Sequence, residues 1–277
     1  MSESADGGPL ALVLSGGGSK GALQVGMYRA LCEVGLEPDF VVGTSVGALN
    51  GALIAAGVGP RSLARGWTDL ARSDLFRFNW SLLWRGLGSE ALFRQGVFRR
   101  FLEKRLPVRN FQELDVPLHV VSTHLSMGTA CHWNEDDLVE AVLASCSVPG
   151  LLPPVYAHGG VPHVDGSLGD NLPVARAREL GAERIVAMTA RTCDRCEPKR
   201  VGIGDVIGRA FSIAADCTLR RMADDVREDP TLLLLQPDLG EQVYALDFSQ
   251  SARLVEAGYE FALPRIRRWA AGSTVES

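Results

Sequence analysis

The chain has 277 residues, of which 46% are hydrophobic and 22% charged, as is typical of a globular protein with a substantial core. Its net charge of −5 argues against a nucleic-acid partner. No apolar run approaches the ~20 residues that span a bilayer, and the N-terminal segment lacks the basic residues and long apolar stretch of a signal peptide. We therefore expect a soluble, cytoplasmic protein.

The first elements form a strand, a loop, a helix and a second strand. LALVL at 10–14 predicts a buried strand, and a glycine-rich loop at 15–21 follows it. Apolar residues at helical spacing then predict a helix that ends near Gly35, before a strand that begins with FVV at 40–42. Two strands joined in this way pair in parallel through a right-handed crossover.

The rest of the chain continues to alternate between strands and helices. Residues 46–57 are rich in small apolar side chains and predict a helix packed closely against a sheet. The later patterns predict strands at 117–125, 129–133, 184–190 and 231–237, and helices at 136–145, 172–180, 204–226 and 249–270. This alternation predicts one α/β domain with a mainly parallel sheet at 9–271, between a polar N-terminal tail at 1–8 and a C-terminal tail at 272–277.

The segment at 63–106 mixes large aromatic residues with arginines. Its members are Phe76, Phe78, Trp80, Trp84, Phe93 and Phe98, and Arg72, Arg77, Arg85, Arg94, Arg99 and Arg100. One interpretation is a helical cap whose aromatic side chains join the core and whose arginines face water. The other is an amphipathic insertion that lies on a lipid surface and makes peripheral membrane contact.

The six cysteines do not form a disulfide framework. Cys193 and Cys196 make a CxxC motif, but no second ligand pair follows at zinc spacing, and Glu197-Pro198 is awkward for a redox motif at a helix start. We interpret both as ordinary loop thiols. We expect no metal and no cofactor.

Residues 43–47 read GTSVG and match the GxSxG pattern of a nucleophile elbow. In such a turn a serine sits between a strand and a helix, and Gly43 and Gly47 are needed because larger side chains would collide with the neighbouring backbone. The turn exposes the hydroxyl beside a helix N-terminus, which favours developing negative charge. Ser45 is therefore a candidate nucleophile.

The loop at 15–21 reads SGGGSKG and can direct several backbone N–H groups at a phosphate or an oxyanion. Gly16, Gly18 and Gly21 also satisfy the GxGxxG pattern of dinucleotide-binding proteins. That interpretation needs an acidic residue after the second strand, but Asp39 precedes this strand. A P-loop would need Ser or Thr after Lys20, where Gly21 stands.

A third motif, Asp165-Gly166-Ser167, follows a short apolar strand and precedes DNLP at 170–173. All five histidines precede Asp165, so Asp165 cannot be the acid of a triad with the order Ser, Asp, His. Such a triad would need an earlier acid, Asp115 or Asp136, with a later histidine. A simpler arrangement is a dyad in which Asp165 itself takes the Ser45 proton.

Together SGGGSKG, GTSVG and DGS with DNLP resemble, in order and separation, the patatin-like phospholipases, which are serine lipid acyl hydrolases with a Ser-Asp dyad. The segment ASCSVPGLLPPV at 144–155 is also similar to the family, and the resemblance covers roughly 9–190. It implies a three-layer α/β/α fold, Ser45 as nucleophile and Asp165 as general base. It further implies an oxyanion hole from the amides around Gly16, Gly17 and Gly18, with Lys20 in the family's basic position.

Two residues depart from the family pattern. Ser15 stands where many members have aspartate or glycine, and Ser167 replaces a frequent glycine or alanine. We expect both to tune activity and not to abolish it. The expected function is cleavage of carboxylic esters in phospholipids or related acyl lipids. The alternatives are a catalytically weak lipid- or acyl-binding protein and, with less support, a nucleotide-dependent oxidoreductase. The lipid class and the oligomeric state stay open.

Overall fold

The computed structural model describes residues 8–79, 91–157, 159–190, 210–215, 229–241 and 243–272. Within them the chain forms one sheet of eight strands. Five of these strands are parallel and run in the order β3-β2-β1-β7-β8, and β4, β5 and β6 add antiparallel pairs at the β3 side. The strands are β1 (Leu10–Leu14), β2 (Phe40–Thr44), β3 (Leu118–His124), β4 (Thr129–Trp133), β5 (Val155–Ala157), β6 (Val161–Asp165), β7 (Arg184–Met188) and β8 (Leu232–Leu235).

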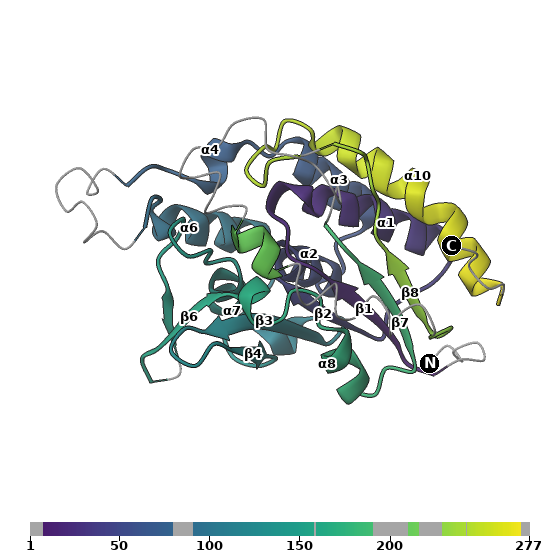
Figure 1. Cartoon of the computed structure of the whole chain (residues 1–277), viewed down its shortest axis with the longest axis horizontal. Coiled ribbons are helices and arrows are strands. Elements are labelled where there is room, and N and C mark those ends of the chain that lie inside the picture. The colour runs from purple at the N-terminus through teal and green to yellow at the C-terminus, as the bar shows by residue number, and fades with distance from the viewer. Residues whose placement is uncertain are drawn as a thin grey trace.

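Helices cover both faces of this sheet (Figure 1). They are α1 (Gly21–Glu33), α2 (Val46–Ala55), α3 (Pro60–Thr68), α4 (Arg72–Leu75), α6 (Gln95–Arg105), α7 (Leu138–Ser145), α8 (Val174–Glu179) and α10 (Ser251–Ala270). Figure 1 shows α10 lying along α1 above the sheet, while α8 lies on the opposite side. In the described segments, short 3-10 helices occupy the loops at η1 (Gly18–Lys20), η3 (Phe111–Glu113) and η4 (Gly166–Leu168).

The alternation of side chains along the strands creates two hydrophobic layers. Leu12 and Leu14 of β1 face the larger layer, which includes side chains of α1, α2, α3, α6, α7 and α10. Ala11 and Val13 face a smaller layer that α8 closes. Because side chains of successive strand residues point to opposite faces, β1 is buried on both. This arrangement confirms the α/β class with helices on both sides of the sheet.

Most predicted elements are present, with shifted ends. The strand expected at 117–125 spans Leu118–His124, and the helix expected at 249–270 spans Ser251–Ala270. β5 and β6 form a hairpin, of which the sequence predicted only the second strand, as a short strand before Asp165. Only 210–215 of the helix expected at 204–226 lies within the described residues, and it is helical.

Several predictions fall wholly or partly outside the described residues. These are the Cys193–Cys196 motif, Trp80, Trp84 and Arg85, and most of both tails. In the described part of 63–106, the rings of Phe76, Phe93 and Phe98 pack together in the core, whereas Phe78 is 40% exposed. In the part of the chain that the structure describes, we find no helix with the length and apolar character that a membrane span requires.

Candidate active site

Ser45 lies at the sharp turn between β2 and α2, at the carboxyl end of a central strand. Its backbone has φ 54° and ψ −123°, a conformation that non-glycine residues rarely adopt. The main-chain carbonyl of Ser45 accepts hydrogen bonds from the amides of Ala48 and Leu49, so the residue begins the helix. This is the strained strand-to-helix turn that GTSVG predicts.

The two flanking glycines are places where chains approach too closely for a side chain. A Cβ atom on Gly47 would lie 2.3 Å from the carbonyl oxygen of Leu14 in β1. A Cβ atom on Gly43 would lie 2.5 Å from the carbonyl oxygen of Gly47 itself. The turn therefore depends on glycine at both positions, because α2 begins in contact with the backbone of β1 and β2.

Sheet pairing explains why Asp165, 120 residues away, reaches Ser45. β4 pairs with β3 over Val120 to His124, β2 pairs with β3 up to Val121, and β6 pairs with it from Ser122 onward. Because a strand has two edges and β4 occupies one of them, β2 and β6 share the other. Thr44 is opposite Val121 and Asp165 is opposite Ser122, so β2 and β6 end next to each other.

At this junction the hydroxyl of Ser45 donates a 2.6 Å hydrogen bond to Oδ2 of Asp165. The other carboxylate oxygen of Asp165 accepts a 2.9 Å hydrogen bond from the amide of Ser167. Asp165 is fully buried, whereas Ser45 keeps 8% of its surface exposed. Burial raises the pKa of Asp165 above its ordinary value of 3.8, although its hydrogen bonds with Ser45 and Ser167 act in the opposite direction.

Ser145, at the end of α7, holds the turn in place and was not singled out by the sequence. The amide of Ser45 donates a 2.7 Å hydrogen bond to its hydroxyl, which donates in turn to the carbonyl of Val121 at 2.5 Å. The neighbouring Cys146 thiol contacts the Ser45 hydroxyl, and burial together with the Asp165 charge raises the pKa of that thiol well above 9. Both residues belong to ASCSVPG, so the motif was visible but their roles were not.

The glycine loop lies beside the Ser45 turn. A Cβ atom on Gly16 would lie 3.1 Å from Cβ of Ser45, and one on Gly21 would lie 2.4 Å from Val46. The amide of Gly16 donates a 3.0 Å hydrogen bond to Oδ1 of Asn171, which the sequence placed in a motif without assigning a role. Gly18 has a φ of 62°, which is accessible to glycine without strain.

The backbone amides of this loop differ in whether they have a hydrogen-bond acceptor. The amide of Ser19 donates to the carbonyl of Ala245, and that of Gly16 donates to Asn171. Among the described residues, the amides of Gly17 and Gly18 have no hydrogen-bond acceptor, and both glycines are partly exposed. Lys20, also partly exposed, is the last residue of η1 and directly precedes α1.

A buried polar network connects the loop to three helices. The side-chain amide of Gln24 donates to the carbonyl of Ser15, and that of Asn50 donates to the carbonyl of Gly21 and to Oε1 of Gln24. The indole N–H of Trp67 donates to Oδ1 of Asn50 at 2.9 Å. The sequence did not reveal this network, because amide side chains on separate helices carry no spacing pattern.

The acids of the alternative triads lie away from Ser45 and Asp165. The amide of Asp115 donates to the carbonyl of Ala55, at the opposite end of α2 from Ser45. Asp136 lies in the loop before α7, where its carbonyl accepts from the amide of Phe111. None of the hydrogen bonds in the described ranges joins a histidine to Ser45 or Asp165. Within those ranges, no three His, Cys, Asp or Glu side chains are grouped in a way that could hold a metal ion.

Comparisons with known proteins identify the family. The model of the patatin-like phospholipase family matches residues 12–178. The chain is 32% identical over 214 residues to lysophospholipase nte1 of Emericella nidulans, and 29% identical over 205 residues to patatin-like phospholipase domain-containing protein 7 of Mus musculus. These matches cover 75% and 71% of this chain but only 13% and 14% of the two relatives. The chain belongs to the patatin-like phospholipase family, as its motifs predicted.

A solved structure shows the same fold at low sequence identity. The crystal structure of VipD from Legionella pneumophila aligns with a TM-score of 0.50 and 15% identity. The alignment covers 95% of this chain and 67% of VipD. This similarity concerns the fold alone.

Proposed function

We propose that the chain is a serine lipid acyl hydrolase of the phospholipase A type, with Ser45 as nucleophile and Asp165 as general base. The observation that carries this proposal is the 2.6 Å hydrogen bond from the Ser45 hydroxyl to Asp165 at a strained turn. Ser45 attacks the ester carbonyl while Asp165 accepts its proton, which gives a tetrahedral intermediate. Asp165 then protonates the leaving alcohol, and water hydrolyses the acyl-enzyme with Asp165 again as base.

A carboxylate is a weak base for a serine hydroxyl, so two features must compensate. Burial raises the pKa of Asp165 and so increases its proton affinity. The fixed turn also holds the reacting oxygen within hydrogen-bond distance of the base, which removes the cost of orienting it.

We assign the oxyanion hole to the amides of Gly17 and Gly18. Within Gly16–Ser19, these two amides have no acceptor in the described part of the chain, whereas those of Gly16 and Ser19 do. They lie in the loop beside Ser45. Gly16 belongs to the site in a different way, because its amide donates to Asn171 and shapes the loop. Stabilisation of the oxyanion by fixed amides would supply much of the rate.

The relatives guide the choice of substrate. The nte1 protein is named a lysophospholipase, so we propose that this chain cleaves acyl esters of lysophospholipids and related lipids. The chain spans about an eighth of that relative's length, so the remaining parts of that protein have no counterpart in this match.

A panel of lipids assayed with the wild type and Ser45→Ala tests this function. The panel contains a lysophospholipid, a diacyl phospholipid, a monoglyceride and an acyl thioester. We expect hydrolysis that Ser45→Ala abolishes, and that Ser249→Ala, a change at an exposed loop serine, leaves intact. A catalytically weak lipid-binding protein would bind these lipids without turning any of them over.

We also propose peripheral membrane contact through the segment at 63–106, where Phe78 is exposed. The triple change Arg77→Ala, Trp80→Ala and Trp84→Ala should weaken sedimentation with anionic phospholipid vesicles. Unchanged sedimentation would instead support a role of this segment as a cap on the core.

A further inference from the structure

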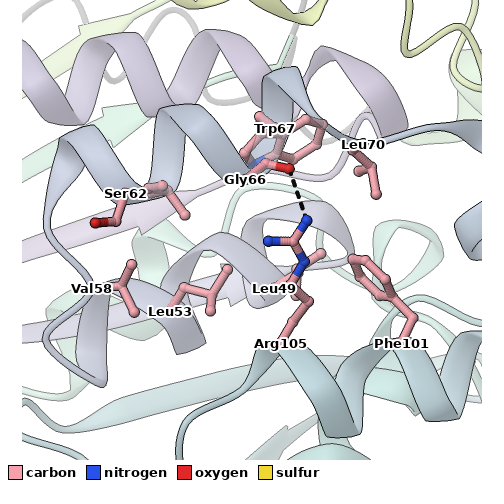
Figure 2. Close-up of a pocket in the computed structure, with 10 residues that line it drawn as sticks. Leu49, Leu53, Val58, Ser62, Gly66, Trp67, Leu70, Phe101 and Arg105 are labelled. Atoms are coloured by element: carbon pink, nitrogen blue, oxygen red, sulfur yellow. Dashed lines mark hydrogen bonds between the residues drawn. The ribbon is translucent and has the colours of Figure 1, made fainter.

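A largely apolar pocket lies between α2, α3 and α6 (Figure 2). It encloses a small cavity of about 200 Å³ and opens to solvent at its mouth. Leu49 and Leu53 of α2, Trp67 of α3, and Leu70 and Phe101 contribute apolar walls. The pocket is therefore suited to hydrocarbon.

Arg105, at the end of α6, provides a cation at the mouth of this pocket. Figure 2 shows its guanidinium reaching from α6 toward α3, where it donates a 3.2 Å hydrogen bond to the carbonyl of Gly66. Its guanidinium also lies 5.7 Å from the ring centre of Phe101. A guanidinium has five N–H donors, and the Gly66 contact is long and exposed, so an anion could take its place at little cost.

The surroundings of the pocket are more basic than the chain as a whole. The helices α3 and α6 carry Arg61, Arg65, Arg99, Arg100, Lys104 and Arg105 and one acidic residue, Glu103, and Arg99 forms an ion pair with Glu140 of α7. The whole chain has a net charge of −5. A negatively charged headgroup would therefore be attracted to this face of the molecule in particular.

This pocket is separate from the Ser45 site. Neither Ser45, Asp165 nor any residue of the glycine loop lines it. It is nevertheless close, because Leu49 lies about one helical turn after Ser45 on α2. Ser62, at the start of α3, and Arg105 are exposed, so the pocket opens to solvent at the outer surface of the helices.

We infer that this small pocket binds one single-chain anionic amphiphile, a medium-chain fatty acid, with the chain against Leu49, Leu53 and Phe101 and the carboxylate on Arg105. An apolar pocket with one cation at its mouth matches a hydrocarbon chain with one anionic end. A lysophosphatidate has the same chemistry with a phosphate as its anion. The site takes its ligand without covalent chemistry and does not depend on the hydrolase function proposed above.

The binding experiment uses the full chain with Ser45→Ala, so that hydrolysis cannot consume a ligand. Isothermal titration calorimetry compares octanoate, 1-octanoyl lysophosphatidate and octanol below their aggregation concentrations. We expect saturable binding of octanoate at one site and weaker binding of octanol, which lacks the charge. Tighter binding of lysophosphatidate would keep the site and identify a phosphate as its preferred anion. Equal binding of octanol and octanoate would overturn the role of Arg105.

Three further changes locate the site in the same background. Arg105→Gln should weaken octanoate binding about fivefold to tenfold, because a charge-assisted hydrogen bond is lost at a partly solvated position. Ser62→Trp inserts a large ring from an exposed position and should abolish binding without disturbing the core. Arg100→Gln removes a cation from α6 that does not line the pocket and should leave affinity within about twofold.

Circular dichroism must show that each variant is folded. Octanoate affinity that is the same in Ser62→Trp and Arg105→Gln as in the parent would overturn the inference. Because the parent lacks Ser45, binding at this pocket can be shown even if the lipid panel shows no hydrolysis. Hydrolysis in the panel can likewise be shown even if the pocket binds no ligand.

Discussion

The backbone amide of Gly16 donates a 3.0 Å hydrogen bond to the side-chain oxygen of Asn171, 155 residues further along the chain. Asn171 is 5% exposed and follows the segment that carries Asp165. The contact joins the glycine loop to the segment of Asp165, the proposed base, so the amides beside Ser45 and this carboxylate are fixed relative to each other. We interpret Asn171 as a positioning residue.

Asn171→Leu should lower kcat for ester hydrolysis by about tenfold or more, because loss of the hydrogen bond to the Gly16 amide lets the glycine loop shift. Asn171→Asp keeps an acceptor at the same place and should retain more activity than Asn171→Leu. Both rates are measured with a soluble acyl ester, beside thermal unfolding of each variant. Equal losses in the two variants would argue against positioning through this hydrogen bond.

The pH dependence of kcat/KM should report Asp165. In the proposed mechanism Asp165 is the base and must be deprotonated, and burial raises its pKa, so activity should fall as the pH drops through a value above the ordinary 3.8. The hydrogen bond with the Ser167 side chain lowers this pKa, so Ser167→Ala should move the acidic limb to higher pH. An acidic limb that stays in place in Ser167→Ala would contradict this assignment.

The same pKa shift has a consequence for stability. A carboxyl group whose pKa is higher in the folded state favours folding most when it is protonated, and this contribution is lost as the pH rises through the raised pKa. Above that raised pKa, the charged Asp165 therefore costs stability. Asp165→Asn should raise the thermal midpoint at neutral pH, with a smaller gain at acidic pH, in calorimetric scans. An Asp165→Asn variant that is less stable than the wild type at pH 7, and by a larger margin than at acidic pH, would refute this.

Gly47→Ala and Gly51→Ala form a matched pair on α2. A Cβ atom at Gly47 meets the Leu14 carbonyl oxygen at 2.3 Å, whereas the atoms nearest to one at Gly51 belong to side chains, at 3.1 Å for Val41 and 3.2 Å for Leu118. Gly47→Ala should lower the free energy of unfolding by about 1–3 kcal/mol and abolish activity. Gly51→Ala should be near neutral, since alanine favours the helix by up to about 1 kcal/mol. Denaturant unfolding and the ester assay check both, and equal effects would contradict the backbone clash.

The sequence predicted the local patterns of this fold well. LALVL, FVV and the glycines around Ser45 depend on near neighbours, so their strands and the turn could be derived from spacing and residue type. The order of the histidines and the family resemblance led to Ser45 and Asp165 as a pair. The structure places these two side chains in direct contact.

Contacts between distant segments were beyond the sequence. The Ser45 amide donates a hydrogen bond to the hydroxyl of Ser145, 100 residues further along the chain, and no periodicity in the sequence marks such a pair. The Asn50 side chain forms hydrogen bonds with Gln24 and Trp67, and no sequence motif marks these three residues as partners. The Gly16 amide looked like any other glycine amide until Asn171 was placed beside it.

Covalent labelling with a fluorophosphonate probe, followed by mass mapping of the modified peptide, tests the central claim most directly. We predict one label on Ser45 in the wild type, none in Ser45→Ala, and labelling about a hundredfold slower or more in Asp165→Asn. A wild-type protein that stays unlabelled, or is labelled on another residue, would contradict the Ser45–Asp165 account.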